Sequence, residues 1–196
     1  MRIVIKLGSS TLMYGSGGLN IRRTEKLCQV IADIANAGHE IVIVSSGAVA
    51  MGAGKMGFGK RPSDIKTKQA CAAVGQCELM YTYDKLFSDH RRCVAQILLT
   101  KSDIENDHRR ENFINTVERL LCLGVIPIIN ENDTVAVDEI VIGDNDTLAA
   151  GVTANIKADM LIILSDTDGL YDSDPHVNPE AKLIPVVYSV DESIES

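Results

Sequence analysis

Four short polar segments of this chain carry residue types that bind charged ligands, and each follows an apolar run. They are Lys6-Leu7-Gly8-Ser9-Ser10, Ser45-Ser46-Gly47-Ala48, Asn130-Glu131-Asn132-Asp133 and Gly143-Asp144-Asn145-Asp146. In an open α/β sheet, ligands bind in a crevice outside the carboxyl ends of the strands. The sequence therefore predicts one site that is assembled from segments far apart along the chain.

The first segment has the chemistry of a phosphate site. Lys6 ends an apolar run and supplies a compact positive charge. Gly8 would let the backbone approach an anion closely, and the N–H groups that follow, starting at Ser9, can form a small nest for phosphate oxygens. Taken alone, a lysine at a strand end is more often a solvated surface group. The combination with the other segments favours the phosphate site.

The second and third segments offer partners for a carboxylate or an ammonium group. Residues 45–48 keep a strand end open and present hydroxyls and amides, although a plain Ser/Gly turn explains them equally well. Residues 130–133 place carboxamides and carboxylates beside an apolar strand, which costs free energy unless hydrogen bonds satisfy them. A ligand with both an ammonium and a carboxylate would do so. The alternative is an Asx-rich turn that leads into a hairpin.

The fourth segment opens an expected helix over 147–158, so Asp144 or Asn145 could serve only as its N-cap. Three consecutive polar residues exceed what a cap needs, and an aspartate held there could orient a catalytic lysine. A further segment, Ser165-Asp166-Thr167-Asp168-Gly169, follows the next strand and could bind the base or ribose of a nucleotide. It does not fit a calcium loop, because the twelfth position would be Pro175.

The regular elements that must position these segments follow an α/β pattern. We expect 3–5 and 160–164 to be central strands, a hairpin within 134–142 at the sheet edge, a loop by Lys60, and an irregular tail before a strand over 186–190. The strand–helix–strand units predict parallel pairing through right-handed crossovers. The other predicted strands are 40–44, 92–99 and 125–129, and the other predicted helices are 21–37, 66–87 and 111–123.

Composition excludes several classes of protein. The chain has 196 residues, 45% of them hydrophobic, which suits a single globular domain. A net charge of -8 argues against nucleic-acid binding, and no apolar stretch is long enough to span a membrane. Five cysteines without a C-x-x-C pair indicate neither a metal site nor a disulfide framework, so we expect a cytoplasmic protein. The G-x-G-x-x-G match at 52–57 does not directly follow a strand and is rejected as a dinucleotide motif.

In this order along the chain, K-L-G-S-S, V-S-S-G-A-V-A, I-N-E-N-D, G-D-N-D and S-D-T-D-G-L-Y resemble the motifs of the amino acid kinase family, and within it the members that phosphorylate glutamate. The stretches at 72–76 and 96–100 extend the resemblance to essentially the whole chain. The resemblance implies an α/β fold, a three-layer αβα sandwich with a mostly parallel open sheet. It also implies transfer of the γ-phosphoryl group of Mg²⁺-bound ATP to the γ-carboxylate of glutamate, a step of proline biosynthesis.

The same resemblance assigns roles to individual residues. Lys6 would contact the transferring phosphoryl group, and Asp146 would organise the catalytic lysine. Since a carboxylate nucleophile needs no general base, catalysis would rest on positioning and charge neutralisation. No protein-bound metal ion is implied. The implied ATP-binding residues are Lys6, Gly8, Ser9, Ser165 and Asp166, and the implied substrate-binding residues are Ser46, Gly47, Asp133 and Asn145.

Family members continue with a glycine-rich, lysine-bearing loop, and many bacterial ones add a PUA domain, whereas this sequence stops at Ser196. We therefore expect residues 1–196 to be an amino acid kinase domain that is incomplete at its C-terminus, lacks a PUA domain and is inactive alone. The resemblance also implies a homo-oligomer, a dimer or tetramer, and proline as a possible feedback inhibitor. The alternatives are an N-acetylglutamate kinase or aspartokinase-like sibling, or a non-catalytic amino-acid-binding fragment.

Overall fold

Five parallel strands form the sheet that carries the candidate residues. The computed structural model describes residues 1–14, 18–59, 62–136 and 145–189, and the chain divides into two compact units, Met1–Leu164 and Ser165–Ser196. The order in the sheet of the first unit is β3-β4-β2-β1-β5, and every pairing is parallel. The strands are β1 (Arg2–Leu7), β2 (Glu40–Ser45), β3 (Val94–Leu99), β4 (Ile126–Glu131) and β5 (Met160–Leu164).

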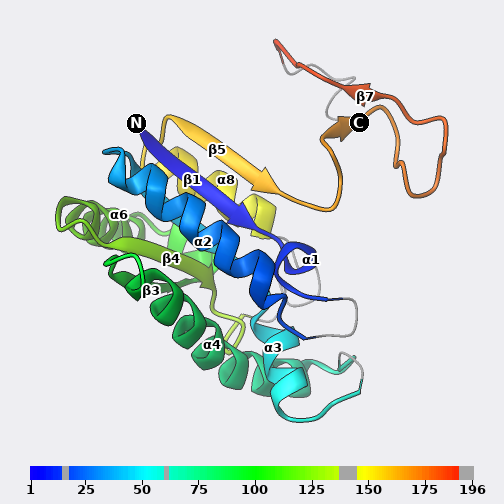
Figure 1. Cartoon of the computed structure of the whole chain (residues 1–196), viewed down its shortest axis with the longest axis horizontal. Coiled ribbons are helices and arrows are strands. Elements are labelled where there is room, and N and C mark those ends of the chain that lie inside the picture. Colours follow the sequence, from blue (N-terminus) through cyan, green and yellow to red (C-terminus); the bar gives the residue numbers. More distant parts are fainter. Residues whose placement is uncertain (15–17, 60–61, 137–144, 190–196) are drawn as a thin grey trace. The chain divides into compact units, whose positions relative to one another are not determined.

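Helices cover both faces of this sheet, which confirms the three-layer αβα prediction. In Figure 1, α2 and α4 lie in front of the sheet, and α6 and α8 lie behind it. Because parallel strands need crossover connections, each helix returns the chain to the same end of the sheet. The helices of this unit are α1 (Ser9–Leu12), α2 (Ile21–Asn36), α3 (Ala48–Lys55), α4 (Ile65–Ser88), α5 (Lys101–Glu105), α6 (Asp107–Cys122) and α8 (Asn145–Asn155).

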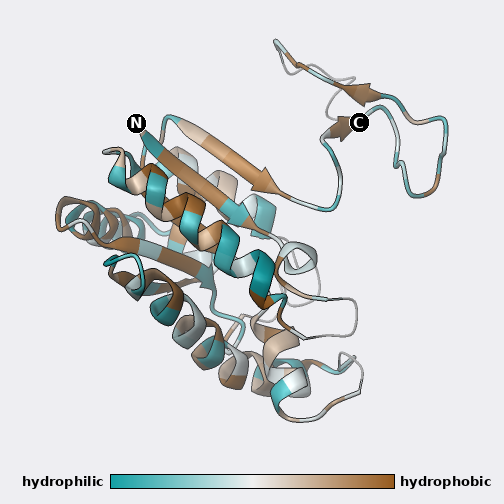
Figure 2. Cartoon of the chain, viewed as in Figure 1, coloured by the Kyte–Doolittle hydropathy of each residue, from teal (hydrophilic) through white to brown (hydrophobic). Residues whose placement is uncertain are grey.

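The alternation of side chains along each strand divides the core into two layers. On β1, Ile3, Ile5 and Leu7 are buried among residues of α2 and α4, whereas Val4 is buried among residues of α6 and α8. The inner strands are buried on both faces, and Figure 2 shows β1 brown along most of its length. Lys6 shares the parity of Val4, so its side chain belongs to the layer of α8.

Two glycines let α3 and α4 pack with their backbones in contact. A Cβ at Gly52 would lie 1.8 Å from the carbonyl oxygen of Cys71, and one at Gly75 would lie 1.8 Å from that of Ala48. The glycine-rich segment therefore stays helical to Lys55, further than its composition alone predicts, because the glycines serve this close approach.

Other elements differ from the sequence-based predictions. Strand β5 was predicted to be central, but among the described strands it pairs only with β1, and 43% of Met160 and 47% of Ile163 are exposed. Helix α5 was not predicted, since its five residues are too few to show a period. The predicted hairpin lies largely outside the described residues.

The second unit contains an antiparallel pair of short strands, β6 (Leu170–Tyr171) and β7 (Leu183–Ile184). The predicted strand at 186–190 is wrong for the described residues 186–189, which form no strand. Next to this pair of strands, Asp172 and Lys182 make two further hydrogen bonds. The backbone N–H of Lys182 donates to the Asp172 carboxylate at 2.8 Å, and the backbone N–H of Asp172 donates to the carbonyl of Lys182. The Asp172 side chain thus extends the ladder of two residues per strand. Strands this short show no apolar alternation, so the sequence did not predict them.

Arg2 ties the amino ends of the sheet to both flanking helices on that face. Its guanidinium donates to both carboxylate oxygens of Glu118 on α6, at 2.6 and 3.0 Å, and to Glu40 on β2 at 2.9 Å. It also donates to the carbonyl of Ile156, which follows α8. Hydrogen bonding to Arg2 lowers the pKa of Glu118 below its ordinary value of 4.5. This anchor lies at the end of the sheet opposite the polar segments.

We predict that Glu118→Gln lowers the free energy of unfolding by about 0.5–1 kcal/mol at neutral pH, because Glu118 is partly exposed and its ion pair is screened. The pKa of Glu118 is lowered in the folded state, so this contribution is present above the ordinary value of 4.5 and is lost as the pH falls through the folded value. Urea unfolding of both proteins across this pH range measures the difference. Glu111→Gln, an exposed position on the same helix, should show no such pH-dependent difference; an equal effect would contradict the assignment.

We predict that Gly75→Ala lowers the free energy of unfolding by about 1–3 kcal/mol, because the new methyl group meets a backbone carbonyl that cannot rotate away. Gly151→Ala in α8 is the matched control. Its Cβ would meet only the Ile104 side chain, at 3.5 Å, so it should stabilise the helix by about 0.5–1 kcal/mol. Chemical denaturation measures both, and equal signs for the two variants would contradict the packing described.

Candidate active site

The carboxyl ends of β1, β2 and β4 meet at one edge of the sheet and bring three of the polar segments together. In the register of β1 with β2, Leu7 lies opposite Ser45, and the N–H of Ser46 continues the ladder by donating to the carbonyl of Leu7 at 3.0 Å. Next to them, β4 ends at Glu131 and turns at Asn132. The predicted convergence of the strand ends is therefore present.

The side-chain amide of Asn145 joins the start of α8 to two strand ends. Its Nδ2 donates to the hydroxyl of Ser46 at 2.7 Å, to the carbonyl of Ser45 at 3.0 Å and to Oδ1 of Asn130 at 3.2 Å. A backbone carbonyl accepts hydrogen bonds and cannot donate them, so it fixes which end of the amide carries the nitrogen. The hydrogen bonds of Nδ2 therefore set the orientation of the Asn145 amide, and its Oδ1 is the end that can accept a hydrogen bond from a ligand.

Asn130 continues the network into the core. Its Oδ1 also accepts from the N–H of Glu131 at 2.9 Å, and its Nδ2 donates to Oε1 of Gln76 on α4 at 2.8 Å. Asn130 and Gln76 are 1% and 8% exposed. Buried amides require hydrogen-bond partners, and the contact between them satisfies one group on each. Asn130 thus contacts Asn145 directly, and Gln76 contacts Asn130 from the core.

The turn after β2 is held from below by Tyr83 of α4 and shaped by a glycine. The Ser45 hydroxyl lies 2.8 Å from the hydroxyl of Tyr83, which is fully buried. Burial raises the pKa of Tyr83, so this pair is neutral. Gly47 follows with φ of +104°, a left-handed conformation in which other residues are strained, and directs the chain into α3. The predicted substrate residues Ser46 and Gly47 therefore occupy a constrained turn.

Lys6 and Asp146 form an ion pair beside this amide network. The Nζ of Lys6 lies 2.5 Å from Oδ1 of Asp146, with 10% of the lysine side chain and 50% of the aspartate side chain exposed. The lysine reaches Asp146 because it lies on the face of β1 that α8 covers. The structure therefore brings together the two residues that the sequence predicted to be catalytic.

Gly8 carries the chain from β1 past the end of β5. Its N–H donates to the carbonyl of Leu164 at 3.3 Å, and the hydroxyl of Thr11 donates to the same oxygen at 3.0 Å. A Cβ at position 8 would lie 3.3 Å from that carbonyl and 3.4 Å from the lysine Nζ, so a glycine suits the close approach. The first N–H groups of α1, including that of Ser9, have no partner within the helix because they belong to its first turn. The Gly8 N–H is used by Leu164 and is not part of the predicted nest, which starts at Ser9 and stays a prediction.

The remaining predicted residues lie in the turn after β4, in the second unit or outside the described residues. Asp133 is half-buried in the turn after β4. Ser165 and Asp166 begin the second unit, where the hydroxyl of Ser165 donates to the Asp166 carboxylate at 3.1 Å. Gly143 and Asp144 lie outside the described residues. The roles predicted for Asp133, Ser165 and Asp166 remain predictions.

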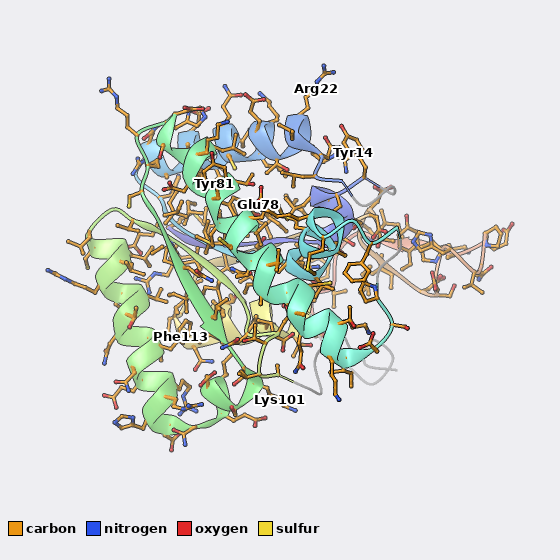
Figure 3. The ribbon with its side chains drawn as sticks, turned by 90° about the horizontal axis from the view of Figure 1, so that it is seen from below. Tyr14, Arg22, Glu78, Tyr81, Lys101 and Phe113 are labelled. Carbon is orange, nitrogen blue, oxygen red and sulfur yellow. The ribbon has the colours of Figure 1, made fainter. Side chains whose placement is uncertain are left out.

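Two residues of the network, Gln76 and Tyr83, are not among the predicted site residues. Both lie on the face of α4 that meets the sheet, together with Leu79 and Phe87, which are fully buried. Figure 3 shows α4 with Glu78 and Tyr81, and the latter is 64% exposed on the other side of the helix. A polar residue on an otherwise apolar helix face is the signal in the sequence that could have identified Gln76.

The arrangement combines a buried cation with a set of amide and hydroxyl groups at one sheet edge. Such a site suits a ligand that carries negative charge next to Lys6 and polar groups next to Asn145. Among the residues described, no group of three or more His, Cys, Asp or Glu side chains could hold a metal ion. No helix in the described ranges is long and apolar enough to cross a membrane.

Comparison with known proteins defines the class to which this fold and site belong. The sequence model of the amino acid kinase family matches residues 1–195. The chain therefore belongs to the amino acid kinase family.

Individual relatives are more particular. The glutamate 5-kinase of Clostridium perfringens is 50% identical over 198 residues, which cover 99% of this chain and 74% of that protein. The glutamate 5-kinase of Clostridium acetobutylicum is 51% identical over 195 residues and 73% of its length. For glutamate 5-kinase 2 of Bacillus subtilis, the values are 50% identity over 195 residues and 53% of its length. The chain thus spans about three quarters of the clostridial relatives and about half of the Bacillus one.

We predict unequal effects on stability for the two halves of the Lys6–Asp146 pair. Asp146→Asn leaves a buried ammonium without its counter-charge and should lower the free energy of unfolding by about 1–3 kcal/mol. Lys6→Met removes the buried charge and leaves a half-exposed carboxylate that water can solvate, so it should change this free energy by less than about 1 kcal/mol.

Chemical denaturation at neutral pH measures this asymmetry. The solvent-exposed pair Lys55–Glu78 provides the control, because Lys55→Met and Glu78→Gln should both leave the denaturation midpoint close to that of the parent. If Lys6→Met proves the more damaging of the two site variants, the lysine is a structural part of the core and the described asymmetry is wrong.

Proposed function

We propose that this chain is the amino acid kinase domain of a glutamate 5-kinase, which transfers the γ-phosphoryl group of ATP to the γ-carboxylate of L-glutamate. The observation that carries the proposal is the placement of the buried Lys6, paired with the half-exposed Asp146, beside the Ser46–Asn145 amide site at the ends of adjacent strands. One part can neutralise a phosphoryl group, and the other can hold an amino acid. The family membership and the names of the relatives support the same reaction.

Glutamate is held in this proposal by the groups around Asn145. The Ser46 hydroxyl and the constrained Gly47 turn face the amino acid, and the Oδ1 of Asn145 together with the Asp133 carboxylate accepts hydrogen bonds from its α-ammonium. Holding both ends of the substrate orients the γ-carboxylate for attack on the phosphorus. Because this carboxylate is already an anionic nucleophile, positioning contributes most of what the protein must supply.

The phosphoryl group is stabilised by Lys6 in this proposal. As negative charge spreads over the transferring oxygens, the ammonium offers a fixed counter-charge that needs no reorganisation. Asp146 holds the lysine in place and is itself half-exposed, so it can release the ammonium to the phosphates. We place Gly8 and Ser9 beside the phosphates, and Ser165 and Asp166 against the nucleoside, as the motif order implies.

Further properties belong to the same proposal. ATP enters as its Mg²⁺ complex, since magnesium is commonly bound through substrate phosphates and only one or two carboxylates. The enzyme acts in the cytoplasm, which the five unpaired cysteines support. It works as a homo-oligomer, and proline, the end product of the route, is its feedback inhibitor.

We predict that glutamate binds about ten- to a hundredfold more tightly than N-acetylglutamate. Acetylation removes the charged α-ammonium, whose N–H groups donate to the Asn145 and Asp133 oxygens in this proposal. Isothermal titration of the chain with each amino acid measures this ratio. Equal affinity would favour an N-acetylglutamate kinase. Catalysis is then tested by incubating the full-length protein with glutamate and ATP and trapping the acyl phosphate with hydroxylamine.

Glutamate binding without trapped product would favour a non-catalytic amino-acid-binding protein.

A further inference from the structure

A chain of three carboxamides runs from the candidate site into the core and ends on an unsatisfied group. Asn145 donates to Asn130, Asn130 donates to Gln76, and the Nε2 of Gln76 is buried without a hydrogen-bond partner. Buried polar groups in native proteins are nearly always paired, so an orphaned donor calls for a reason. Retaining Gln76 therefore costs stability, because a buried donor without a hydrogen bond has lost its water and gained no partner.

The direction of the chain is fixed by the backbone. The N–H of Glu131 can only donate, so the group of Asn130 that faces it must be Oδ1. The Nδ2 of Asn130 then points to Gln76, and the oxygen of Gln76 must face it. The Nε2 of Gln76 is consequently directed away from Asn130. Rotating the amide would satisfy nothing, because it would set two N–H₂ groups against each other.

Gln76 lies at a position of α4 where the backbones of two helices are in contact. Gln76 follows Gly75, whose backbone is in contact with Ala48 at the start of α3, and the N–H of Met51 in that helix donates to the carbonyl of Gly47. The same helix face carries Tyr83, which supports Ser45. Both strand ends of the candidate site are therefore held from one face of α4.

We propose that Gln76 is a positioning residue for the amino-acid substrate: through Asn130, it holds the carboxamide of Asn145 so that Oδ1 is presented to the α-ammonium of the substrate. The inference rests on the proposed function, because it assigns the ammonium to this oxygen. Without the Gln76 acceptor, the Asn130 side chain loses the hydrogen bond of its Nδ2, although the N–H of Glu131 still donates to its Oδ1, so this oxygen is held less firmly against Asn145. The unmet hydrogen bond of Nε2 is the cost of this arrangement.

The variant Gln76→Met separates positioning from stability. It has a similar length, and it removes the orphaned Nε2 while leaving the Nδ2 of Asn130 without its acceptor. The number of unsatisfied buried donors in this network therefore stays the same, and the urea midpoint should stay close to that of the parent. Gln76→Leu provides a second apolar replacement if the methionine variant folds poorly.

The experiment measures the binding of glutamate and of glutarate, which has both carboxylates but no ammonium, by titration calorimetry. We expect Gln76→Met to weaken glutamate binding about tenfold, the net worth of one hydrogen bond, and to leave glutarate binding unchanged. Gln69→Met is the matched control, since Gln69 lies two turns earlier on α4 and makes no described side-chain hydrogen bond. It should leave both affinities unchanged.

The outcomes distinguish this inference from the function on which it rests. If the parent chain fails to bind glutamate, the proposed function is wrong. If the parent binds glutamate but Gln76→Met binds it equally well, or weakens glutamate and glutarate together, Gln76 is only a core residue and the positioning role is wrong. A tenfold loss that is confined to glutamate supports the role.

Discussion

The hydrogen bonds of the Asn145 side chain are the interaction on which the candidate site depends. One Nδ2 group connects the start of α8 to the end of β2, 99 and 100 residues earlier in the sequence, and to the end of β4, 15 residues earlier. These strand ends would otherwise leave carbonyl and amide groups beside the core without partners, at a cost in free energy. The orientation of α8, and hence of Asp146 at its next position, follows from this contact.

The alternation of strand side chains decides which layer each polar residue meets. Lys6 lies on the face of β1 that α8 covers and finds Asp146 there, whereas Ser45 and Asn130 lie on the opposite face and find Tyr83 and Gln76 of α4. A shift of one residue in any strand would move its polar end to the wrong layer. The division of labour between a charged part and an amide part of the site is therefore a consequence of register.

Helix α4 links the packing of the core to the geometry of the site. Its backbone contacts α3 at Gly52 and Gly75, and its buried face supports two strand ends. The Arg2 anchor at the opposite end of the sheet has no part in this contact network, although it joins β1, β2 and α6. The Arg2 contacts can thus be altered without touching the groups that form the candidate site, because the two lie at opposite ends of the same strands.

The sequence by itself determined the α/β class, most helices and strands, and the meeting of the segments that contain Lys6, Ser46 and Asn130 at one sheet edge, because apolar runs that end in polar segments mark the carboxyl ends of buried strands. The roles of Lys6, Ser46, Asn145 and Asp146 remain predictions. The sequence could not determine that β5 lies at the edge of the described sheet, since the order of strands depends on pairings that no local pattern records. It also gave no role to Gln76, because a buried amide acquires one only when Asn130, 54 residues later, is placed against it. Tertiary structure decided which polar groups meet, since the hydrogen bonds from Asn145 to Ser46 and from Asn130 to Gln76 join segments whose proximity exists only after the sheet has formed.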